Sequence, residues 1–240
     1  MPRAEDPGRV PAWRLLPRFV AMDARLGLAR IARRIGTRTL ADVPSDALEM
    51  PDSRLCRDAV ALASATSAPA VLNHSLRSYA FGSVLAARNR LVIDREVLFV
   101  AAVLHDLGLN ADLADAPGSF EWVGAGRARA FCAERRLDAD RTRLVHDAIA
   151  LHSSVGIAHR REPEVALVHF GAGADLLGLR LDEVPPDVLQ RILARHPRLA
   201  FKRCFGALLA HQAATKPASH IAGHVGLGLL RRLRAAAFEE

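Results

Sequence analysis

The sequence predicts an all-α protein with a single helical core. Half of its 240 residues are apolar but only 5% are aromatic, which favours packed aliphatic helices over a β-sandwich. Apolar residues recur at helical spacing along the chain, and no segment alternates in the way that is typical of a strand. A chain of this length can bury one sizeable core. We expect residues 51–240 to form that core and residues 1–50 to be an N-terminal helical extension.

Start signals separate the predicted helices of the first half. A capping Asp or Ser, or a proline in the first turn, stands where each apolar periodicity begins. These signals are Asp52 or Ser53, Pro69, Asp94 and Asp138. Residues 1–12 hold three prolines and are expected to be disordered or extended. The predicted helices cover residues 13–34, 52–66, 70–89, 95–107, 120–135 and 139–152, with loops over 36–51 and 110–119.

The second half is predicted in the same way. Glu162-Pro163-Glu164 opens a helix that runs to about Gly171, and Pro185-Pro186 lies in the start of another. The remaining helices are predicted over residues 182–195, 200–214 and 225–230. The 110–119 loop contains Pro117 and Gly118 and is a candidate lid or substrate wall.

Charge and cysteine usage limit the classes of function. The net charge is +7 and the pI about 10.5, so nucleic acid is a partner to consider. The arginines are scattered without a block of like charge, which favours solvated helix faces, and we expect no nucleic-acid partner. No apolar run is long enough for a membrane span. Three widely spaced cysteines do not indicate a disulfide framework, and we expect a cytoplasmic protein.

The most informative feature is His105-Asp106, at the end of a wholly apolar helix. Burying a carboxylate there is costly unless a partner neutralises it, and a divalent metal suits both side chains. His74 and Asp175 also lie in apolar, small-residue settings. Two imidazoles and two carboxylates suit Zn²⁺, our first choice, or Fe²⁺ or Mn²⁺. By contrast, we expect the His146-Asp147 pair, which lies in a polar run, to be largely at the surface.

The order of these residues resembles the H…HD…D signature of the HD-domain superfamily of all-α metal-dependent enzymes. Residues 73–82, 102–108, 119–126 and 165–178 look like its cyanamide-hydratase-like branch, and the resemblance covers roughly residues 52–220. It implies an HD-domain helical bundle in which the metal ligands correspond to His74, His105, Asp106 and Asp175.

Other residues are candidates for acid–base chemistry and substrate binding. His152 and His169 can act as acid or base groups beside the metal ligand Asp106, or could hold a second metal. Arg77 shares a helix face with His74, so it could anchor an anionic substrate or pair with Glu121 or Asp106. The resemblance implies a wall or supporting role for Glu121 and places Lys216 in a C-terminal segment that closes the site.

Three functions follow, in order of preference. The first is a hydratase or hydrolase in which metal-bound hydroxide adds to a small nitrile or related C–N compound; the cyanamide substrate class is implied by the resemblance. The second is an HD phosphohydrolase acting on a nucleotide or other phosphate ester, although Arg77 is the one obvious phosphate anchor on the ligand face. The third is a non-enzymatic basic binding module. Apolar helices at both ends of the chain permit a homodimer.

Overall fold

The structure, a computed structural model, describes residues 12–35 and 43–238. Within these ranges the protein has eleven α-helices, four short 3-10 helices and no strand, which confirms the predicted all-α fold. The expectation for residues 1–11 lies outside the described residues. Among the described helices, none has the length and apolar character needed to cross a membrane.

The centre of the fold is α4 (Arg95–Leu104), and its surroundings explain its composition. Every side chain from Val97 to Leu104 is buried, so an uninterrupted apolar run is required. Asp94 caps its first turn by accepting from the backbone N–H groups of Glu96 and Val97. The packing partners are α2 (Arg54–Thr66), α3 (Pro69–Arg88), α6 (Ala139–Leu151) and α7 (Pro163–Leu177).

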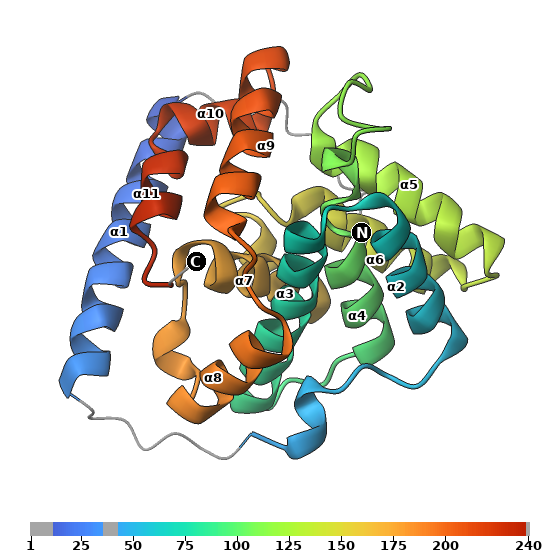
Figure 1. The fold of residues 1–240 in the computed structure, drawn as a ribbon, viewed down its shortest axis with the longest axis horizontal. Coiled ribbons are helices and arrows are strands. Elements are labelled where there is room, and N and C mark those ends of the chain that lie inside the picture. The colour runs from blue at the N-terminus through green and yellow to red at the C-terminus, as the bar shows by residue number, and fades with distance from the viewer. Residues whose placement is uncertain (1–11, 36–42, 239–240) are drawn as a thin grey trace.

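The other helices surround this centre. In Figure 1, α5 lies on the right beside α6, and α8 lies at the bottom. Two of the short 3-10 helices, η2 and η3, follow α4 and α6 directly in the chain. The bounds of these elements are α5 (Phe120–Glu134), α8 (Pro186–Arg195), η1 (Ser45–Leu48), η2 (Leu107–Leu109), η3 (Ala158–Arg160) and η4 (Leu181–Glu183).

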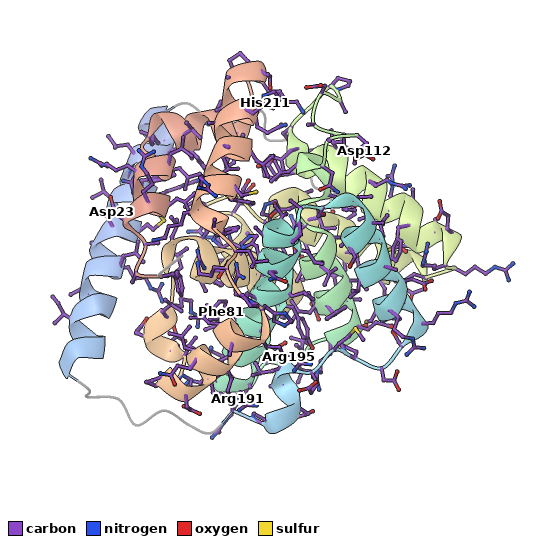
Figure 2. The ribbon with its side chains drawn as sticks, viewed as in Figure 1. Asp23, Phe81, Asp112, Arg191, Arg195 and His211 are labelled. Atoms are coloured by element: carbon purple, nitrogen blue, oxygen red, sulfur yellow. The ribbon has the colours of Figure 1, made fainter. Side chains whose placement is uncertain are left out.

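A second apolar cluster joins the two ends of the chain. Helix α1 (Ala12–Ile35) lies beside α10 (His220–Gly226) and α11 (Leu229–Ala235), with α9 (Phe201–Thr215) next to them (Figure 1). Asp23, labelled on α1 in Figure 2, accepts two hydrogen bonds from Arg232, at 2.7 and 2.6 Å. The helix α1 of the predicted extension is therefore packed against the last helices through apolar contacts and an ion pair.

Several helix bounds differ from those predicted. Helix α7 continues six residues past Gly171 to Leu177, because its glycines are packing positions within the helix. The helix predicted over 95–107 ends at Leu104, and η2 follows. The helix predicted over 225–230 is wrong, because Gly228 adopts a left-handed conformation that separates α10 from α11. The start predicted at 182 is the 3-10 helix η4, with α8 beginning at Pro186.

The loop over residues 110–119 is fixed to neighbouring helices. The Gln212 side-chain amide of α9 donates to the carbonyl of Ala114 at 3.0 Å, and Asn110 donates to the Thr66 hydroxyl at 2.9 Å. Figure 2 marks His211 on α9 and Asp112 in this loop; His211 lies 3.6 Å from Asp115. The loop therefore bridges α2 and α9.

Candidate metal centre

His74 lies in the second turn of α3, with its two ring nitrogens facing different partners. It is 1% exposed, and it stacks on Phe201 with ring centroids 4.6 Å apart. Its Nδ1–H donates to Asp175 at 2.7 Å. A neutral imidazole that donates through Nδ1 keeps a lone pair on Nε2. That Nε2 lies 3.5 Å from the carboxylate of Asp106.

His105 and Asp106 occupy the turn where α4 ends. His105 donates its Nδ1–H to the carbonyl of Ala102 at 2.7 Å, which again leaves Nε2 as a lone-pair donor. The close approach of α5 to this turn requires Gly108, since a Cβ there would lie 1.9 Å from the carbonyl oxygen of Phe120. Both His105 and Asp106 are almost fully buried. The end of the apolar helix thus delivers an imidazole and a carboxylate to the interior.

These three side chains form one group that fits a metal ion. His74, His105 and Asp106 each offer a ligand atom, and those atoms lie within 4.8 Å of one another. The Asp106 Oδ2 is 3.1 Å from the His105 Nε2 and 3.5 Å from the His74 Nε2. Two ligands at about 2.0–2.1 Å from a tetrahedral ion lie about 3.3 Å apart. The two separations from Asp106 are therefore close to those of a tetrahedral site, and the group could hold a metal ion.

The hydrogen bonding of this group also points to a cation. Among the described residues, the Nε2 of His105 and both carboxylate oxygens of Asp106 are buried without a hydrogen-bond partner. Leaving an ionised carboxylate in that state is costly unless a positive charge compensates it. Burial would raise the pKa of Asp106, but His105 and His74 lower it to about 2. The carboxylate is therefore ionised and suited to bind a divalent ion.

Asp175 lies on the other side of His74 from this group. The sequence predicts it as a fourth ligand, but its carboxylate contacts the Nδ1 of His74, whereas the Nε2 faces Asp106. It also accepts from Arg77 at 2.7 and 2.8 Å and from Arg198 at 2.8 Å. Burial would raise its pKa, but the hydrogen bond with His74 and the Arg77 charge hold the pKa far below its ordinary value. In this structure Asp175 therefore fixes the orientation of the His74 ring, and its role as a fourth ligand stays a prediction.

Arg77 is buried in this network and does not pair as predicted. Its partner is Asp175, not Glu121 or Asp106, and its NH1 donates to the carbonyls of His196 and Pro197. All three guanidinium nitrogens are thus used within the protein. Arg198, which the sequence analysis missed, completes the network from the segment before α9. It lies in no periodic segment, so no sequence pattern pointed to it.

His152 lies next to the group of His74, His105 and Asp106 (the metal group), and His169 contacts His152. His152 donates its Nδ1–H to the Ile149 carbonyl at 2.7 Å, and its Nε2 is 3.8 Å from the Asp106 Oδ1. His169 donates its Nδ1–H to the carbonyl of His152 at 2.6 Å. Burial lowers the pKa of both, to about 3 for His152. Both are therefore neutral at pH 7, in the form that can accept a proton.

A small cavity of about 70 Å³ opens onto the group, and its walls are mostly apolar. Phe19 and Met22 of α1 form part of these walls, so the N-terminal helix contributes to the site. The polar residues that line the cavity are His74, His105, Asp106, His152, Ser153, His169 and His224. The cavity can accept a molecule of only a few heavy atoms.

The remaining predicted residues lie outside the walls of this cavity. Glu121 is buried and accepts a hydrogen bond from Ser153, a wall residue, at 2.5 Å. Lys216 is at the C-terminal end of α9, where burial lowers its pKa.

The predicted surface position of Asp147 is wrong, because it is 1% exposed and lies 3.5 Å from Arg143 and 3.6 Å from Arg161.

Fold and site together define an all-α protein whose buried His-His-Asp group could hold a metal ion. No protein-family model matches the chain. Two curated proteins of Saccharomyces cerevisiae, Cyanamide hydratase DDI2 and Cyanamide hydratase DDI3, are similar to it. Each is 28% identical over 156 residues, which cover 62% of this chain and 68% of the yeast protein. The chain is thus a distant relative of proteins named cyanamide hydratase.

Proposed function

We propose that this protein is a metal-dependent hydratase of the HD-domain type, which adds water to a small nitrile such as cyanamide and forms urea. The observation that carries the proposal is the buried His74, His105 and Asp106 group in the lining of a small apolar cavity. The distant likeness to two yeast cyanamide hydratases supports the substrate class. A linear three-heavy-atom substrate suits a cavity of this size.

Different residues of the chain would hold the metal ion, transfer the proton and exclude bulk water. The ligands would be His74, His105 and Asp106, and Zn²⁺ is the preferred ion for such a set. When bound, the ion supplies activation of water at neutral pH. His152, whose Nε2 lies 3.8 Å from Asp106, would take up a proton from the water at that nitrogen and return it to the nitrile nitrogen, so the reaction releases no net proton. The apolar walls exclude bulk water, which strengthens electrostatic interactions inside.

A phosphohydrolase is less well supported by the same geometry. A phosphate group needs cationic donors that converge on it. Arg77, the predicted anchor, donates from all three guanidinium nitrogens to Asp175 and to backbone carbonyls. The cavity lining contains no arginine or lysine within the part of the chain that the structure describes. A neutral substrate therefore fits this cavity better than an anionic one.

The test combines metal analysis with product assays on purified protein. We expect about one equivalent of metal in the wild type and urea formation from cyanamide. His105→Ala and Asp106→Asn should lose the metal and reduce kcat/KM by about 100-fold or more. His211→Ala, at an imidazole that is 51% exposed on α9, is the matched control and should keep both. Wild type that releases phosphate from nucleotides and forms no urea would contradict the proposal.

A further inference from the structure

His224, on α10, shares the cavity with the metal group although it lies far from that group in sequence. It is 3% exposed and forms part of the cavity wall. Its Nε2 is buried and has no hydrogen-bond partner among the described residues. A buried, unpartnered polar atom in a cavity wall is a site where a ligand can supply the missing hydrogen bond.

Neighbouring rings fix the orientation of His224. Phe19 of α1 packs edge-on against it, with centroids 5.1 Å apart and planes at 67°. The His220 ring, one turn earlier on the same helix, is 4.2 Å away at 65°. Ser219 caps this helix by accepting from the N–H of Ala222. The imidazole is therefore presented to the cavity by a capped helix and two aromatic contacts.

The surroundings also decide the kind of ligand that His224 suits. Burial, followed by the nearby histidines 220, 169 and 152, lowers its pKa well below the ordinary value. A neutral imidazole offers one N–H donor and one lone pair. The unpartnered Nε2, as donor or acceptor according to the tautomer, suits a small neutral molecule that carries an amino group or a nitrile or carbonyl, and the uncharged ring supplies no charge to balance an anion.

We propose that His224 is a substrate-binding residue that hydrogen-bonds a small neutral nitrile or amide and holds it against the metal group. The inference rests on the proposed function for the identity of the substrate. The site consists of His224 together with His74, His105 and Asp106, which line the same cavity. Phe19 contributes by fixing the ring, so α1 takes part in substrate binding through this contact.

The experiment uses zinc-loaded protein and two probes, cyanamide and urea, with binding measured by calorimetry and turnover by urea formation. His224→Leu removes both ring nitrogens at similar volume, His224→Asn keeps a donor and an acceptor, and His211→Leu is the exposed control. We expect His224→Leu to keep its zinc but to bind both probes about 10-fold more weakly and to raise KM by a similar factor. His224→Asn should recover part of the loss, and His211→Leu should match wild type.

The outcomes separate the inference from the proposed function. Equal binding by wild type and His224→Leu overturns the inference, as does loss of zinc from that variant or failure of wild type to bind either probe. Wild type that binds the probes through His224 but forms no urea supports the inference and removes the proposed function. If circular dichroism shows that His224→Leu is unfolded, His224→Asn is compared with wild type in its place. Binding and KM values of folded His224→Asn that both equal those of wild type would overturn the inference.

Discussion

Asp175 connects three parts of the chain through one buried carboxylate. It is on α7, and its partners are His74 and Arg77 on α3 and Arg198 before α9. The hydrogen bond to the Nδ1 of His74 fixes the tautomer that keeps the Nε2 lone pair available. The two arginines keep the carboxylate charged in the interior. The residue therefore supports both the metal group and the packing around it.

Asp175→Asn should impair metal binding and stability together. The amide cannot compensate two buried guanidinium groups, so the free energy of unfolding should fall by about 3–5 kcal/mol. Because the hydrogen bond that orients His74 is altered, the zinc dissociation constant should rise about 10–100-fold. Chelator competition and urea unfolding measure the two effects. Asp112→Asn, at an exposed carboxylate, is the control, and equal zinc affinity in both variants would refute the orienting role.

The sequence predicted which residues form the site better than it predicted the contacts between them. His74, His105 and Asp106 could be found because each is a polar residue in an apolar setting, and the structure brings all three together. The contact between Asp175 and His74 could not be found, because it depends on which ring nitrogen faces which element. Arg198 and His224 lie in segments where no periodic pattern points inward, so their positions required the folded chain.

At the scale of elements, α3 and α7 approach each other so closely that only glycine fits. A Cβ on Gly171 would lie 2.1 Å from the carbonyl oxygen of Ser78, far inside van der Waals contact. The two helices that carry His74 and Asp175 are therefore held backbone to backbone. This also explains why the sequence placed the end of α7 too early, since glycines that serve packing resemble glycines that end helices.

Gly171→Ala and Gly126→Ala should change stability in opposite directions. The first must push α3 and α7 apart, and we expect a loss of at least about 3 kcal/mol, from overpacking together with separation of His74 from Asp175. The second lies inside α5 with no atom within 4 Å of its added Cβ, so it should gain about 0.5–1 kcal/mol. Urea unfolding of the two variants checks this, and similar changes for both would show that the close approach does not matter.

At the scale of the whole molecule, buried histidines couple stability to pH. Burial lowers the pKa of His74, His152 and His169 below the ordinary value of 6.5. The unfolded chain therefore binds more protons than the folded chain once the pH falls below about 6.5. His105 acts in the opposite direction: burial lowers its pKa, but Asp106, the hydrogen bond to the Ala102 carbonyl and the charge of Asp175 together outweigh burial and raise it. The balance favours loss of stability in acid.

We expect the free energy of unfolding of metal-free protein to fall as pH decreases from about 6.5 towards 3. His74, His152 and His169 each change the free energy of unfolding by up to about 1.4 kcal/mol per pH unit, over the pH range between the folded and unfolded pKa values of that histidine. Urea unfolding at pH 7, 6, 5 and 4 measures the slope. His152→Gln should make it shallower, while His211→Gln should leave it unchanged; a stability that stays constant from pH 7 to pH 4 would contradict the assignment.

The overall architecture followed from composition and helical periodicity, because packing of aliphatic helices is what those patterns encode. The role of residues 12–35 did not follow. Their apolar spacing predicts a helix but does not say which surface covers it. In the structure, Leu15, Phe19 and Met22 are buried against the C-terminal helices, and two of them line the cavity.

The packing of α1 has a practical consequence for anyone who shortens this protein. A version that starts at residue 51, where the sequence suggests that the core begins, would lack Phe19 and Met22. The cavity would lose one side and become an open groove, and Ile221 and Leu229 would be exposed to solvent. Such a fragment would self-associate through this exposed apolar surface. It would also discriminate poorly between small and bulky compounds.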